Sequence, residues 1–202
     1  MRIAIVTFDG FNELDSFIAS ALLNRVKQPG WKAEITCPTE SVTSMNGVKI
    51  DAQQPLAFAN EADIVLFGSG ILTRTISQDD EIMAQFDLNP DRQLIGAQCS
   101  GSLFLHKLGL IDQLPVCADS MTRPVLEDLG VNVLDQPFAA SGNIATAGGC
   151  LASHYLAMWA IWHGAGREAA QAIIHYVAPV GQKDDYTARA TEVVGAFFTV
   201  SA

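Results

Sequence analysis

Apolar residues in the first half of the chain gather into short runs that end at turn-forming or small polar residues. The runs lack the polar alternation of a half-exposed strand, so they are typical of strands buried on both faces, as in a parallel sheet. The first run ends at Asp9-Gly10 and the third at Gly68-Ser69-Gly70, both common turn sequences. The four predicted strands are residues 2–8, 32–37, 63–67 and 94–98.

Helical patterns follow these runs. Between residues 14 and 22 the apolar positions recur at helical spacing, Asn12 supplies a start signal, and Pro29-Gly30 ends the pattern. Further helices are predicted at residues 100–108, 121–129, 150–162 and 167–176. The alternation of strands and helices predicts an α/β fold with a mostly parallel sheet covered on both faces. No linker or repeat divides the chain, so residues 1–202 are predicted to form one domain.

Weaker signals predict further β-structure. Asn46-Gly47 is a typical hairpin turn, and its predicted arms are residues 42–45 and 48–51. In the second half of the chain, apolar β-branched residues predict strands at residues 131–134 and 144–147.

The charge balance narrows the class of partner. The chain has 22 acidic and 12 basic residues, a formal net charge of −10, and its Lys and Arg residues are scattered. This pattern argues against nucleic acid and anionic membranes as partners. The first apolar run is too short for a signal-peptide core, and no apolar run approaches the length of about 18 residues that spans a membrane. We therefore expect a cytoplasmic protein.

The cysteines are widely separated in sequence. Cys37, Cys99, Cys117 and Cys150 form no CxxC pair, which disfavours a zinc site or a disulfide framework, so we expect no metal. Cys117 and Cys150 are candidates for a second thiol, although buried, inert cysteines are commoner.

Cys99 has the most informative setting. It lies between a predicted buried strand and a predicted helix, with the small residues Ala97 and Gly101 two positions on either side. Small residues are needed where a sharp strand-to-helix turn, a nucleophile elbow, brings the two backbones together. A helix N-terminus stabilises a thiolate, so the setting predicts a lowered thiol pKa. The alternative is an ordinary buried thiol beside a turn.

The turn after the third strand is a candidate anion site. The backbone amides around Ser69 and Gly70, with the amide of Ser100, are placed to form an oxyanion hole at the carboxyl edge of the sheet. The alternative is a glycine-rich turn without a chemical role.

A carboxyl in the first helix is a candidate proton carrier. Asp15 follows the first strand, so a hydrogen bond to the Cys99 thiolate is within the expected topology. Its spacing from Asn12 also suits helix capping, and Glu13 is expected to be solvated.

No histidine is an evident partner for Cys99. His106 lies seven residues further along the same predicted helix, about 10 Å along its axis. His154 is a weaker candidate for a base, whereas His163 and His175 are expected at helix ends or on the surface.

Four segments, taken in order, resemble the DJ-1/PfpI (ThiJ) superfamily, which includes class I glutamine amidotransferase-like proteins, and are most similar to its isonitrile hydratases. The four segments are Phe8-Asp9-Gly10-Phe11-Asn12-Glu13-Leu14-Asp15, residues 63–70, Gln98-Cys99-Ser100-Gly101-Ser102, and Ala147-Gly148-Gly149. The resemblance implies a flavodoxin-like three-layer sandwich, usually homodimeric, with Cys99 as nucleophile and Asp15 as its acidic partner.

Two departures from the family pattern bear on activity. The usual Pro-Gly-Gly is Gly68-Ser69-Gly70 here, which implies a reshaped oxyanion site. Where many members carry Thr-Thr-His, this chain has Cys117-Ala118-Asp119, so a Cys-His relay is not expected. Asp119 would instead place negative charge near Cys99 and oppose thiolate formation.

Three functions follow from these observations. The resemblance implies a cofactor-independent small-molecule hydratase, in which Cys99 attacks an isonitrile carbon, Asp15 carries a proton and water releases a formamide. A glyoxalase acting on 2-oxoaldehydes is the alternative enzyme. A non-enzymatic redox or ligand sensor that uses Cys99 is the third interpretation.

Overall fold

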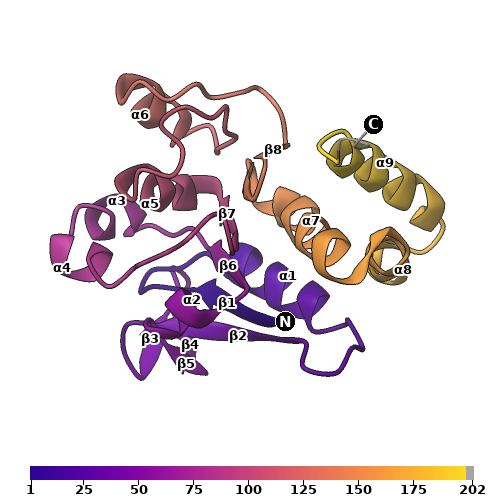
Figure 1. The fold of residues 1–202 in the computed structure, drawn as a ribbon, viewed down its shortest axis with the longest axis horizontal. Coiled ribbons are helices and arrows are strands. Elements are labelled where there is room, and N and C mark those ends of the chain that lie inside the picture. The colour runs from indigo at the N-terminus through magenta and orange to yellow at the C-terminus, as the bar shows by residue number, and fades with distance from the viewer. Residues whose placement is uncertain (199–202) are drawn as a thin grey trace.

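The computed structural model describes residues 1–198 and contains a seven-stranded sheet with the order β5-β2-β1-β6-β7-β9-β8 (Figure 1). Neighbouring strands run parallel except β8 and β9, which are antiparallel. The sheet strands are β1 (Arg2–Val6), β2 (Lys32–Cys37), β5 (Gln54–Pro55), β6 (Ile64–Phe67), β7 (Leu94–Gln98), β8 (Phe138–Ser141) and β9 (Ile144–Ala147). The parallel central strands confirm the predicted α/β sheet.

Helices cover both faces of the sheet. The α-helices are α1 (Glu13–Leu23), α2 (Phe58–Glu61), α3 (Thr73–Ile76), α4 (Asp80–Met83), α5 (Ser102–Lys107), α6 (Arg123–Asp128), α7 (Ser153–Ala165), α8 (Arg167–Val177) and α9 (Lys183–Gly195). Figure 1 shows α1 and α7 to α9 on one side and α3 to α5 on the other. The three layers agree with the predicted sandwich.

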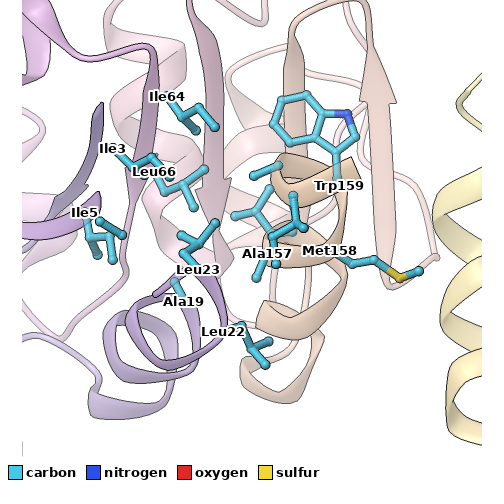
Figure 2. Close-up of a cluster of buried hydrophobic side chains, with 14 of the residues drawn as sticks. Ile3, Ile5, Ala19, Leu22, Leu23, Ile64, Leu66, Ala157, Met158 and Trp159 are labelled. Carbon is cyan, nitrogen blue, oxygen red and sulfur yellow. The ribbon is translucent and has the colours of Figure 1, made fainter. Parts of the chain in front are cut away.

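Each face of the sheet has its own hydrophobic cluster. In β1, Ile3 and Ile5 join the cluster under α1 and α7, whereas Ala4 and Val6 join the opposite one. Figure 2 shows the first cluster, where Leu23 of α1 lies between the strand side chains and α7. A strand that packs on both faces has no polar side, which explains why its sequence is apolar throughout.

The short-range predictions for the first half hold. The hairpin at Asn46-Gly47 is present as antiparallel strands β3 (Ser41–Thr43) and β4 (Lys49–Asp51). The side chain of Asn12 caps α1 by accepting a hydrogen bond from the amide of Leu14.

The short elements β5, α2, α3 and α4 of the first half were not predicted, and the second half contains a wrongly placed strand and a missed helix. Residues 131–134 are not a strand of the sheet, since Val133 forms only an isolated bridge to Val116. The outer strand is instead β8, whose sequence Phe-Ala-Ala-Ser has few β-branched residues. Helix α9 was not predicted, because its sequence is polar and lacks a sharp apolar face. No helix within residues 1–198 is long and apolar enough to cross a membrane.

The end of β7 packs backbone to backbone against the end of β6. A Cβ on Gly101 would lie 2.7 Å from the Gly68 carbonyl oxygen and 2.8 Å from that of Phe67. These contacts are shorter than a Cβ tolerates, so the turn after β7 requires glycine, as the spacing of small residues predicted.

We expect Gly101→Ala to lower the free energy of unfolding by about 1–3 kcal/mol, because backbone atoms must move to admit the methyl group. Gly195→Ala, in α9, is the control and should be neutral or slightly stabilising, since its Cβ meets only the Trp162 ring edge at 3.3 Å. Urea denaturation measures both changes. Equal effects of the two substitutions would contradict the packing described here.

Candidate active site

Cys99 lies on a strained turn between β7 and α5. Its φ is 50°, and no other non-glycine residue in the described part of the chain has a positive φ. The residue begins a short 3₁₀ helix, Cys99–Gly101, and is only 3% exposed. Backbone strain at a reactive side chain is typical of functional sites. The geometry agrees with the nucleophile elbow predicted from the sequence.

Asp15 is buried beside Cys99. The first turn of α1 brings this carboxyl, 2% exposed, into the interior at the carboxyl end of the sheet. It accepts hydrogen bonds from the hydroxyl of Ser69, from the Cys99 thiol and from the Ser153 hydroxyl at 3.3 Å. Asn12 caps the helix instead, so Asp15 is free to contact the thiol.

Burial disfavours the charged form of both side chains, and Asp15 adds to this effect at Cys99. Burial raises the pKa of Asp15 from 3.8 to about 6, against the opposing effect of its hydrogen bonds. Burial and the negative charge of Asp15 raise the pKa of the Cys99 thiol. The predicted lowering by the helix terminus is therefore wrong, because only a short 3₁₀ turn and a buried anion face the sulfur. The resting pair is a thiol next to a carboxyl group that titrates near neutrality.

A second thiol completes the cluster. Cys150, at the start of the 3₁₀ helix Cys150–Ala152, has its Sγ within 4.8 Å of both the Cys99 Sγ and an Asp15 oxygen. The Asn12 amide donates a hydrogen bond to the Cys150 Sγ at 3.0 Å. The sequence offered only one signal for this neighbour, namely that Cys150 follows a strand at the same edge of the sheet.

The predicted oxyanion site is only partly available. The Gly68 amide donates to the Val6 carbonyl oxygen, whereas the Gly70 amide points to the Ser100 hydroxyl at 3.5 Å. A Cβ on Gly70 would lie 2.4 Å from the Gly10 carbonyl oxygen. Close packing of the two loops therefore explains why residue 70 is a glycine. The Gly70 amide and the Ser100 hydroxyl remain candidate donors for an oxyanion.

Asp119 lies at the rim of the site in a structural position. Its carboxylate accepts hydrogen bonds from the amides of Met121 at 2.9 Å and Thr122 at 3.1 Å. The preceding residue, Ala118, packs against Gly148, where a Cβ would meet its carbonyl oxygen at 2.4 Å. The negative charge of Asp119 also raises the pKa of both Asp15 and Cys99, in the direction expected from the sequence.

Comparison with known proteins identifies the family of this chain. Residues 1–161 match the model of the DJ-1/PfpI family. This chain belongs to the DJ-1/PfpI family. A search of the curated proteins gave no match.

Solved structures share the fold at low sequence identity. DJ-1 from Schizosaccharomyces pombe is 18% identical, with a TM-score of 0.75 over 89% of this chain and 100% of that chain. DJ-1beta from Drosophila melanogaster is 20% identical, with a TM-score of 0.75 over 87% and 96%. A ThiJ/PfpI family protein from Pseudomonas syringae is 18% identical, with a TM-score of 0.76 over 96% and 90%.

In this DJ-1/PfpI protein the histidines have other neighbours. His106 lies 3.3 Å from Asp112, and His175 lies 3.2 Å from Asp184. His154 contacts the Leu151 carbonyl oxygen at 2.5 Å, and His163 packs on Trp159. Glu13 accepts hydrogen bonds from Ser44 and Asn46 of the β-hairpin loop. The carboxyl that is hydrogen-bonded to Cys99 is therefore that of Asp15 and not that of Glu13.

Gln98 is a site residue that the sequence reasoning missed. Its Nε2 donates to the Gly149 carbonyl oxygen at 2.8 Å and lies 3.5 Å from the Cys99 Sγ. Its Oε1 is buried and has no partner among the described residues. The side chain ties the β7 turn to the loop that carries Cys150.

A groove reaches the cluster from the surface. It has a volume of about 990 Å³ and lies among α1, α7, α8 and α9, with Gly149, Cys150 and His154 in its wall. Cys150 therefore separates the groove from the buried Cys99.

A soft divalent metal binds thiolate and carboxylate donors, and the cluster of Asp15, Cys99 and Cys150 contains both types. The lone pairs of Asp15, however, already accept hydrogen bonds from Ser69, Ser153 and Cys99.

The raised pKa of Asp15 predicts a pH-dependent cost in stability. Because the folded protein holds this proton more tightly than the unfolded chain, stability falls as the pH rises from 3.8 to about 6. The full difference corresponds to about 3 kcal/mol. Asp15→Asn should therefore gain about 2–3 kcal/mol relative to the native protein between about pH 4 and about pH 7. Urea denaturation at both pH values measures this, and a difference that is independent of pH would contradict the assignment.

Proposed function

We propose that the protein is a cysteine-dependent hydratase that converts isonitriles into N-substituted formamides. The observation that carries the proposal is the buried Cys99 thiol, hydrogen-bonded to an Asp15 carboxyl with a pKa of about 6. The four histidines contact other groups, so a cysteine-histidine relay has no support.

The first half of the reaction uses both groups of the pair. The Cys99 sulfur attacks the terminal carbon of R–N≡C while the Asp15 carboxylate accepts the thiol proton. Asp15 then delivers this proton to the same carbon, which gives the thioimidate R–N=CH–S on Cys99. A carboxyl that titrates near neutrality suits both transfers, because it is ionised when it accepts the thiol proton as the S–C bond forms and is then acidic enough to deliver that proton.

The second half adds water. Asp15, again a carboxylate, takes a proton from water as the oxygen attacks the thioimidate carbon. Asp15 passes this proton to the nitrogen, and then accepts the hydroxyl proton of the adduct as the C–S bond breaks. R–NH–CHO leaves, and Asp15 returns the second proton to the sulfur, which regenerates the thiol. The sum is R–N≡C plus water giving the formamide, with no redox change and no cofactor.

A resting thiol fits this chemistry better than a resting thiolate. The reaction must place a proton on the isonitrile carbon, and the Cys99–Asp15 pair holds that proton next to the sulfur. The buried setting that raises both pKa values keeps the proton there.

The surrounding groups have proposed supporting roles. We assign the Gly70 amide and the Ser100 hydroxyl to the substrate or to the oxygen of the water adduct, and Ser69 to orienting Asp15. Asp119 adds negative charge that favours the protonated thiol. We also propose a homodimer, which the resemblance implies, and a cytoplasmic location, which we expected from the first apolar run; sedimentation analysis tests the former and cell fractionation the latter.

We expect the native protein to form N-substituted formamides from alkyl isonitriles, detected by chromatography and mass spectrometry. Asp15→Asn should reduce kcat by about 10²–10⁴-fold, the typical contribution of a positioned acid-base group, and Cys99→Ser should remove turnover. Glu13→Gln is the matched control on the same helix and should retain activity. Lactate from methylglyoxal, with no formamide from isonitriles, would favour a glyoxalase instead.

The pH profile provides a separate check. Because Asp15 must be ionised to accept the thiol proton, kcat/KM should rise with pH and level off above about 6. Glu13→Gln should keep this profile. A profile without an ionisation near that pH, or an Asp15→Asn protein with full turnover, would overturn the assigned role of the carboxyl.

A further inference from the structure

Cys99 and Cys150 are brought together by two adjacent parallel strands. Each cysteine begins a 3₁₀ turn after its strand, β7 or β9, and Gln98 pairs with Ala147 in the sheet register. The two Sγ atoms lie within 4.8 Å of each other, although the residues are far apart in sequence.

The two thiols differ in exposure and surroundings. Cys99 is 3% exposed and faces Asp15, which opposes its ionisation. Cys150 is half-buried and lines the groove, so a small molecule reaches it first. The Asn12 amide donates to its Sγ at 3.0 Å, and such a donor stabilises a thiolate.

We propose that Cys150 is a redox-active thiol that reacts with hydroperoxides in the groove and then forms a reversible disulfide with Cys99. The bond blocks the Cys99 nucleophile and protects it from further oxidation. The proposed disulfide depends on the positions of the two sulfurs and not on which substrate the enzyme converts.

The chemistry balances in two steps. The Cys150 thiolate attacks one oxygen of R′OOH, the O–O bond breaks, and the alkoxide takes a proton to give R′OH and Cys150–SOH. The Cys99 thiol then loses its proton to Asp15, its sulfur attacks the Cys150 sulfur, and the S–O bond breaks as hydroxide leaves and is protonated to water. Two thiols are oxidised by two electrons and one hydroperoxide is reduced. A dithiol restores both thiols by exchange.

The two sulfurs must approach further for the bond to form, because a disulfide requires an S–S distance of about 2.05 Å. Gly149, just before Cys150, has a φ of +88° and no neighbouring atom within 4 Å of where a Cβ would lie. Gln98 holds this loop by donating to the Gly149 carbonyl oxygen at 2.8 Å, so this contact must adjust when the disulfide forms.

The test exposes the reduced protein to one equivalent of hydrogen peroxide, followed by thiol blocking and mass spectrometry of a non-reduced digest. We expect a peptide pair linked through Cys99 and Cys150 that a dithiol separates. In Cys99→Ser, Cys150 should accumulate as a sulfenic acid that dimedone captures. In Cys150→Ser, the disulfide should be absent and Cys99 should oxidise more slowly than Cys150 does in the native protein.

Two further variants complete the design. Asn12→Asp keeps a helix-capping side chain but removes the amide donor to Cys150, and it should slow disulfide formation by about tenfold, the effect of one lost charge-assisted hydrogen bond. Cys37→Ala, in β2, is the control and should leave the rate unchanged. Oxidation of Cys99 to sulfinic acid while Cys150 remains a free thiol would overturn the proposal, as would cross-links only between molecules.

Discussion

The burial of the Asp15 carboxyl against the Cys99 thiol is the constraint on which the chemistry of this DJ-1/PfpI protein depends. Burial raises the pKa of both groups and the charge of Asp15 raises that of Cys99 further, so the pair holds a proton on the sulfur rather than a thiolate. The hydrogen bonds from Ser69 and Ser153 only partly offset the cost of desolvating the carboxyl. A fold that keeps this carboxyl buried uses part of its stability to keep the proton at the nucleophile.

The rest of the architecture serves to hold this pair in place. Asp15 comes from the helix after β1, Ser69 from the turn after β6 and Cys99 from the turn after β7, all at the carboxyl edge of the sheet. Gly70 and Gly101 allow the turns to approach one another through backbone contacts. The site is therefore built by loop packing at the strand ends, the usual location of ligand sites in open α/β sheets.

The sequence predicted the parts that depend on local patterns. The doubly buried strands, the Asn12 cap and the elbow at Cys99 all had a signal in residue type and spacing. The choice of Asp15 over Glu13 came from the family resemblance. Cys150 had only the weak signal of a cysteine after a predicted strand, and Gln98 had none, because their contact with Cys99 depends on the pairing of β7 with β9. The thiol pKa was predicted in the wrong direction, since burial and the charge of Asp15 act through tertiary contacts that spacing does not reveal.

The protonation state of Cys99 tests this account most directly. The pH dependence of thiolate absorbance, measured as the difference between native protein and Cys99→Ser, isolates this one sulfur. The account predicts no thiolate signal from Cys99 at neutral pH. In Asp15→Asn, where the opposing charge is removed, the thiolate should appear at a lower pH than in the native protein. A thiolate with a pKa below about 7 in the native protein would contradict it, because the helix terminus would then outweigh burial and Asp15 would not hold the proton.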